Sequence, residues 1–176
     1  VVDGDADDRA VEEPALLEPV ERAKRHHLRQ VAGDAEDDEN VGRLRLRVAR
    51  YHITPPQWPA GLKLRIAAIA DLHACDPWMS LDHVQAIVER TNALKPDIVV
   101  MLGDYVAGHR KVTRFIPDAD WAAALAGLKA PLGVHAVLGN HDWWEDKEVQ
   151  RHGRGLPSAG RALQAAGIPV YENDAK

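Results

Sequence analysis

The stretch Gly133–Trp144 reads GVHAVLGNHDWW, and it places three polar side chains directly after an apolar run. The apolar part, which ends at Leu138, has the composition and length of a buried strand. After Gly139 the chain continues with an amide, an imidazole and a carboxylate at Asn140, His141 and Asp142. Ligands in α/β sheets bind outside the carboxyl ends of the strands, so this stretch predicts a strand that ends at a functional edge.

Two earlier apolar runs end in the same way. The run IAAIA, from Ile66 to Ala70, leads into Asp71 and His73, and the run DIVVML leads into Gly103 and Asp104. A fourth apolar run is IPVY at 168–171. The glycines allow tight turns and a close backbone approach where the runs end.

Helical patterns separate these runs. Ser80 is a suitable N-cap, and the segment after it repeats apolar residues at helical spacing as far as Leu94. A second helix is expected from Asp118, with Trp121 in its apolar stripe, and a third over SAGRALQAAG at 158–167. The alternation of strands and helices predicts an α/β layered domain with mostly parallel strands, whose carboxyl ends share one edge.

The N-terminal part of the chain differs in composition from the rest. Residues 1–42 carry an excess of acidic side chains and no aromatic residue, which is typical of a disordered segment or of one that is not native. Residues 43–176 carry a small basic excess and all the aromatic residues. Within them, LRLRVARYHI at 44–53 alternates apolar and polar side chains, which predicts a half-exposed strand.

Composition also excludes several classes of protein. The basic excess is too small to indicate nucleic-acid binding. Cys75 is the single cysteine, so an internal disulfide is impossible. No run reaches the roughly 18 apolar residues of a membrane span, and no signal peptide is recognisable. The chain begins with Val1 and stops soon after IPVY, so we expect a fragment or a gene model with wrong ends.

The three polar strand ends together predict a metal site. A single aspartate after a strand is more often a cap or turn residue. Several carboxylates gathered at one edge, however, are costly unless a positive charge neutralises them. Imidazole, carboxylate and amide oxygen are a mixed ligand set that suits Mn, Fe or Zn.

The motifs DLH, GD and GNHD, in this order and each after an apolar run, resemble those of the calcineurin-like metallophosphoesterase superfamily. The sequence around these motifs is most similar to a bacterial branch of phosphodiesterases and UDP-diacylglucosamine hydrolases. The resemblance implies a layered α-β-β-α sandwich. It also implies two divalent metal ions and a bridging hydroxide that attacks a phosphodiester, phosphomonoester or pyrophosphate.

The resemblance also implies a role for each matching residue. Asp71 and His73 would bind the first metal, Asp104 would bridge both metals, and Asn140 would bind the second. His141 would face the substrate phosphate, and Asp142 would orient His141 or hold the loop. The implied partner is a phosphorylated small molecule or a lipid head group. The implied location is cytoplasmic or peripheral to a membrane, the latter in a full-length parent.

This chain departs from the family pattern in its C-terminal half. The family completes its site with histidines in GH and GHxH segments, whereas His152 is the one histidine after His141, and we expect it to be solvated. Residues 43–176 are therefore expected to form the N-terminal part of a truncated sandwich that is poorly active alone, with one face of its sheet uncovered. The alternatives are a degenerate metal- or phosphate-binding module without catalysis, and a truncated product without a role.

Other residues near the motifs have two interpretations each. Trp143 and Trp144 would form an aromatic wall for the substrate, or one of them packs in the core. His109 and Arg110 would contact a phosphate or head group, although a solvated loop is the simpler interpretation. Structural or surface roles are expected for the following: Cys75, His83, Trp121 and His135.

Overall fold

The structure is a computed structural model, and it describes residues 46–108 and 111–173. Its centre is a four-stranded sheet in the order β1-β3-β5-β6. The strands are β1 (Ile66–Ile69), β3 (Ile98–Met101), β5 (Val134–Val137) and β6 (Val170–Tyr171). Every neighbouring pair is parallel, so the predicted α/β class is confirmed.

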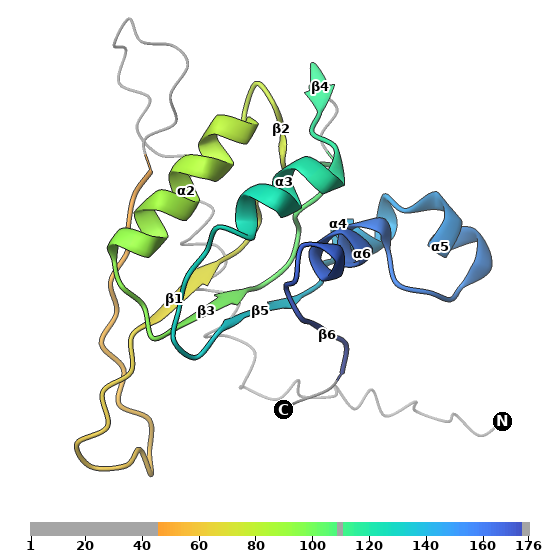
Figure 1. The fold of residues 1–176 in the computed structure, drawn as a ribbon. Helices are drawn as coiled ribbons and strands as arrows, with labels where there is room; N and C mark the ends of the chain where they lie inside the picture. The colour runs from red at the N-terminus through yellow and green to blue at the C-terminus, as the bar shows by residue number, and fades with distance from the viewer. Residues whose placement is uncertain (1–45, 109–110, 174–176) are drawn as a thin grey trace, which may run out of the picture. The chain divides into compact units, whose positions relative to one another are not determined.

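Three helices connect successive strands and cover one face of this sheet (Figure 1). They are α2 (Leu81–Ala93), α3 (Asp118–Leu125) and α6 (Ser158–Ala165). Because the strand order advances in one direction and crossovers are right-handed, each connecting helix returns on the same side. The described residues thus form one sheet and one helix layer of the expected sandwich.

The hydrophobic core lies between the sheet and these helices. Val99 and Met101 of β3 and Ala136 of β5 face the helices and are buried. Trp121 of α3 is buried as predicted, and its ring stacks on Tyr105 at 5.3 Å between ring centroids. Burial of such large side chains contributes about 1.5–3 kcal/mol each, so this layer fixes the position of the strand ends.

The opposite face of the sheet is apolar and exposed. Ile66 is 54% exposed, Leu102 52% and Val137 40%. These side chains alternate with the buried ones along each strand, as the period of two requires. The expected uncovered sheet face is therefore present among the described residues.

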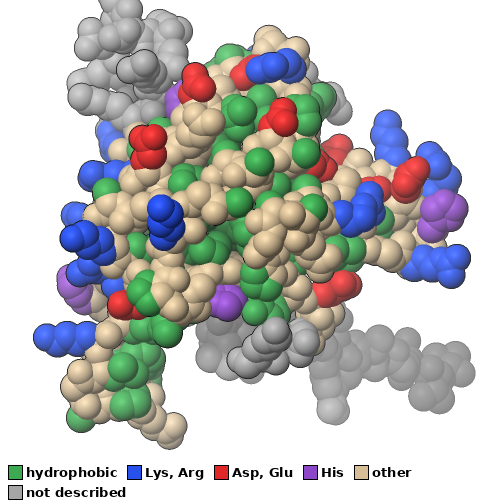
Figure 2. All heavy atoms as spheres, viewed as in Figure 1, with side chains coloured by type: hydrophobic (Ala, Val, Ile, Leu, Met, Phe, Trp, Pro, Cys, Tyr) green, Lys and Arg blue, Asp and Glu red, His purple; other side chains and the backbone are tan. Residues whose placement is uncertain are grey.

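Figure 2, drawn from the same direction as Figure 1, shows basic side chains spread around the edge of the view with acidic ones among them.

Some local structure differs from the sequence-based expectation. The described part of the predicted strand at 44–53 has no strand structure, and Leu46, Tyr51 and Ile53 are exposed. Alternation alone does not make a strand, because strand formation also depends on packing against neighbouring strands and on burial. A short antiparallel pair that the pattern did not indicate joins β2 (Cys75–Asp76) to β4 (Arg114–Phe115). The expectation for residues 1–42 lies outside the described residues and stays a prediction.

Two short helices that the sequence pattern did not indicate follow β5. They are α4 (Asn140–Trp144) and α5 (Lys147–His152). Asp146 caps α5 by accepting hydrogen bonds from the N–H groups of Glu148 and Val149, each at 3.0 Å. The motif GNHD thus lies at the start of a helix, directly at the carboxyl end of the sheet.

Candidate metal centre

The loops that leave β1 and β3 run side by side past the end of the sheet. The N–H of Asp71 donates to the Gly103 carbonyl at 3.1 Å, and the N–H of His73 donates to the Asp104 carbonyl at 2.9 Å. These bonds continue the parallel pairing of the strands into the loops. The DLH and GD motifs are consequently held next to each other by backbone contacts.

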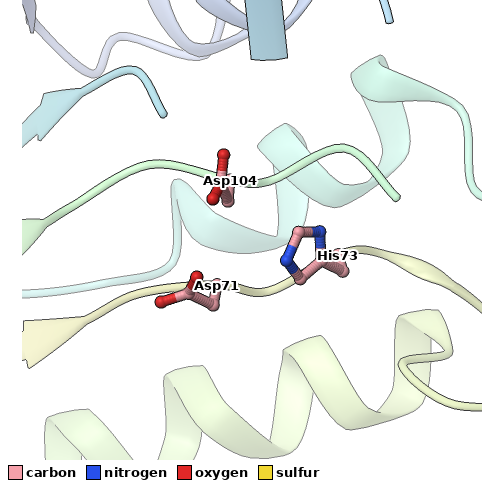
Figure 3. Close-up of side chains that lie close together, drawn as sticks. All are labelled: Asp71, His73 and Asp104. Carbon is pink, nitrogen blue, oxygen red and sulfur yellow. The ribbon is translucent and has the colours of Figure 1, made fainter. Parts of the chain in front are cut away.

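The side chains of Asp71, His73 and Asp104 converge (Figure 3). One ligand atom from each residue lies within 4.8 Å of the other two. Asp71 is exposed, while His73 and Asp104 are half-buried, so solvent reaches one side of the group. Two carboxylates and an imidazole form a donor set that fits a divalent transition metal.

All three residues have a left-handed backbone, with φ of +54° at Asp71, +46° at His73 and +57° at Asp104. This conformation costs a non-glycine residue about 1–3 kcal/mol, and it persists where the surrounding structure fixes it. Such residues cluster at functional sites. The strain therefore supports a functional interpretation that is independent of the ligand geometry.

Two glycines bring the loops after β3 and β5 into backbone contact. A Cβ atom on Gly103 would lie 2.2 Å from the nitrogen of Gly139. A Cβ atom on Gly139 would lie 2.2 Å from Oδ1 of Asp104. The absence of side chains at these two positions lets Asn140 and His141 follow directly beside Asp104.

Asp142 is buried and ties these loops together. Its Oδ1 accepts from the N–H groups of Tyr105 at 2.9 Å and Val106 at 3.1 Å. Its Oδ2 accepts from Asp104 at 2.9 Å and Gly139 at 2.8 Å. Burial raises the pKa of the Asp142 carboxyl, and these four N–H groups act in the opposite direction. Of the two roles expected for Asp142, the contacts favour holding the loop.

His141 lies beside the candidate ligands. Its backbone N–H donates to Oδ1 of Asp104 at 2.8 Å. Its ring lies edge-on to that of His73, with the ring centroids 5.0 Å apart. Asn140 is the first residue of α4 and is exposed. The loop after β5 therefore delivers the GNHD motif to the same edge as Asp71, His73 and Asp104.

His73 has the ring orientation of a metal ligand. Its Nδ1 lies 2.9 Å from the Val106 carbonyl oxygen. Because a carbonyl oxygen only accepts, Nδ1 carries the proton and the lone pair is on Nε2. A backbone carbonyl that fixes one ring nitrogen is the usual outer-shell partner of a metal-binding histidine.

The other candidate residues are distributed around this edge or away from it. Trp144 is 62% exposed with its ring 5.5 Å from that of His141, while Trp143 is half-buried. His109 and Arg110 lie outside the described residues. His135 accepts from the Tyr171 hydroxyl and donates to the Leu132 carbonyl, both at 2.9 Å, in keeping with a structural role.

The sequence reasoning overlooked two residues near His141. Glu145 lies four residues after His141, with its Oε1 3.5 Å from Nδ1 of the imidazole. A Cβ atom on Gly108 would lie 2.4 Å from the same Nδ1. The spacing of four residues would have indicated Glu145 only if GNHDWW had been recognised as the start of a helix.

Comparison with known proteins agrees with the motifs and the fold. The family model described as calcineurin-like phosphoesterase matches residues 64–170. This match covers more than half of the chain, so the chain belongs to the calcineurin-like phosphoesterase family. It includes all the strands of the parallel sheet except the last residue of β6.

Individual relatives have related descriptions. A metallophosphoesterase of Aquifex aeolicus is 37% identical over 130 residues, which cover 74% of this chain and 44% of the relative. The UDP-2,3-diacylglucosamine pyrophosphatase LpxG of Chlamydia trachomatis is 34% identical over 138 residues, 73% of this chain and 39% of the relative. The chain thus spans less than half the length of either relative. No solved structure matches it.

A further relative is described by its membrane association. A transmembrane protein with a metallophosphoesterase domain from Danio rerio is 33% identical over 99 residues, 56% of this chain and 21% of the relative. Within residues 46–108 and 111–173 of the present chain, every helix is too short or too polar to cross a bilayer.

Proposed function

We propose that this protein is a metal-dependent phosphoester hydrolase whose first metal ion is bound by Asp71, His73 and Asp104. The observation that carries the proposal is the convergence of these three side chains within 4.8 Å at the carboxyl edge of the sheet. Family membership supplies the class of reaction. The resemblance of the GNHD motif to that of the family assigns Asn140 to a second metal ion, and Asn140 directly follows Gly139, which contacts Asp104.

When bound, divalent ions such as Mn, Fe or Zn polarise phosphoryl oxygens and generate a nucleophile at neutral pH. The residues of this chain supply the remaining parts of the mechanism. His141 is placed beside His73 and is half-buried, so it can donate a hydrogen bond to a substrate phosphate or a proton to the leaving oxygen. Asp142 holds the backbone of both neighbouring loops, so His141 and Asp104 keep their relative positions during the reaction.

The substrate class is a phosphodiester, phosphomonoester or pyrophosphate. The name of the Chlamydia relative favours a pyrophosphate that carries a lipid-linked head group. The exposed ring of Trp144, next to His141, can stack on an apolar or nucleobase part of such a substrate. Association with a membrane surface in a longer parent protein fits the same substrate class.

A second candidate function is a metal- or phosphate-binding module without catalysis. Among the described residues, the group of side chains that could bind a metal has three members, two aspartates and one histidine. His152 in α5 is exposed. A site with so few ligands can bind one metal ion weakly without assembling the pair of ions that two-metal hydrolysis requires.

Metal stoichiometry and turnover separate the two functions. The purified chain would be titrated with Mn²⁺ and Zn²⁺ by calorimetry and then assayed on bis-p-nitrophenyl phosphate. Two bound equivalents and turnover that Asp104→Asn abolishes support the hydrolase. One equivalent without turnover supports the binding module. Absence of metal binding in the calorimetric titrations would refute both the hydrolase and a metal-binding module.

A further inference from the structure

Glu145 is placed against the buried ring nitrogen Nδ1 of His141. Nδ1 of His141 is buried and makes no hydrogen bond within the part of the chain that the structure describes. The Glu145 carboxylate oxygen Oε1 lies 3.5 Å from it. The two residues are one helical turn apart, and the N–H of Glu145 donates to the His141 carbonyl at 3.0 Å, so the helix fixes their spacing.

The loop after β3 closes over this pair. A Cβ atom on Gly108 would lie 2.4 Å from Nδ1 of His141 and 2.7 Å from Oε1 of Glu145. The backbone of Gly108 therefore contacts both groups and keeps water away from the ring nitrogen. A buried nitrogen that is shielded in this way needs a protein partner, and the carboxylate is in position to be one.

We propose that Glu145 is a positioning residue, which accepts a hydrogen bond from the Nδ1–H of His141 and thereby directs Nε2 toward the substrate phosphate. Which imidazole nitrogen carries the proton is set by the hydrogen bond that the other makes. The distance of 3.5 Å is long for a hydrogen bond, and hydrogen bonds of this kind are often long before substrate binds. The proton on Nδ1 is kept in both the neutral and the protonated ring, and Nε2 carries a second proton when His141 donates to a phosphate or to the leaving oxygen. Glu145 therefore sets the tautomer and orientation and takes no part in proton transfer.

The catalytic consequence rests on the proposed function, but the tautomer does not. Without Glu145, no acceptor among the described residues lies within hydrogen-bond distance of the buried Nδ1, so nothing in that part of the chain favours a proton on this nitrogen. If Glu145 and His141 were only a solvent-exposed pair at helical spacing, their interaction would stabilise the helix by about 0.2–0.5 kcal/mol. Removing Glu145 would then leave the His141 tautomer unaffected. The side chain of Glu145 is 43% exposed, so its removal is tolerated by the fold.

The test is the tautomer of His141 in the full chain with isotope-labelled histidine. Proton–nitrogen NMR spectra of the rings would be recorded over a series of rising pH values, and the tautomer would be read where the ring signals no longer change with pH. The His141 signals are assigned by their loss in His141→Gln. We expect the Nδ1–H form to dominate in the wild-type protein and to be lost in Glu145→Ala. Glu89→Ala, which removes an exposed glutamate from α2, should change nothing.

A second variant tests the same contact from the other side. Gly108→Ala should displace the pair and also cost His141 its Nδ1–H form. A wild-type protein with the proton on Nε2, or a tautomer that Glu145→Ala leaves unchanged, would overturn the inference.

Kinetics then report the catalytic consequence. For Glu145→Ala we expect kcat to fall by about 10- to 100-fold, which is part of the roughly 100- to 10,000-fold that a positioned acid contributes, while KM stays unchanged. If the wild-type chain shows no hydrolysis but has the predicted tautomer, the proposed hydrolase function fails and the role of Glu145 in fixing His141 stands.

Discussion

Gly103→Ala tests whether backbone contact between two loops builds the site. Gly103 has a φ of +95°, and a Cβ atom added to it would meet three backbone atoms of Leu138 and Gly139, from 2.2 to 2.7 Å away. Backbone held by strand β5 cannot yield as a flexible side chain would. The substitution must therefore force the loops after β3 and β5 apart.

The cost has two parts that a matched control separates. A left-handed backbone costs an alanine about 1–2 kcal/mol, and inserting a methyl group into a packed site typically costs about 1–3 kcal/mol. Gly155 has a φ of +99° and nothing within 4 Å of its Cβ position, so Gly155→Ala carries the first part alone. We expect Gly103→Ala to lower the free energy of unfolding by about 2–5 kcal/mol in total.

The assay is urea unfolding followed by tryptophan fluorescence, because the buried Trp121 reports on the core. Calorimetric titration with Zn²⁺ supplies a second measurement. Separation of the loops moves Asp104 away from its partners, so Gly103→Ala should also weaken metal binding, whereas Gly155→Ala should not. Equal losses of unfolding free energy in the two variants would refute the close contact.

The remaining predictions concern a helix cap and the exposed sheet face. Asp146→Ala should lower the free energy of unfolding by about 1 kcal/mol, because Asp146 caps α5 and also accepts from the N–H of Ser158 at 2.8 Å. Burial acts to raise the pKa of Asp146, but three backbone N–H groups and Arg161 outweigh it and lower the pKa. The ionised Asp146 carboxylate therefore stabilises the fold above the usual aspartate pKa of about 3.9, and this contribution is lost as the pH falls further. In urea titrations from neutral to acidic pH, the free energy of unfolding should fall less for Asp146→Asn than for the wild type. Ile66→Lys should reduce binding of an apolar fluorescent dye to the exposed sheet face. The stability should change little, because this side chain is 54% exposed. Unchanged dye fluorescence would mean that the sheet face is not accessible.

The sequence predicted the parallel sheet because its strands are short apolar runs separated by well-patterned helices. Ser80 accepts a hydrogen bond from the N–H of His83 at the start of α2, as its position before the apolar stripe indicated. The same reasoning failed for residues 46–53, the described part of the alternating segment at 44–53. Strand formation depends on packing against neighbouring strands, and a local pattern contains no information about those neighbours.

The candidate ligands could be predicted because topology alone places them. Right-handed crossovers bring the ends of β1, β3 and β5 to one edge, so Asp71, Asp104 and His141 had to lie near one another. Contacts that depend on side-chain length and loop conformation were not predictable in this way. Glu145 was missed because its partnership with His141 exists only if the chain becomes helical at Asn140.

The left-handed conformation of the three candidate ligands explains why loop geometry, and not only residue type, defines the site. An extended strand points successive side chains to opposite faces, so Asp71 and His73, two residues apart, would share a face of the sheet. With φ of +54° and +46°, the backbone instead turns out of the strand at both residues, and both side chains meet Asp104 at the edge. Aspartate and histidine are among the few residues that tolerate this conformation. The residue types that bind a metal are thus also the types that allow the turn, which is why a three-residue motif can specify ligand and loop together.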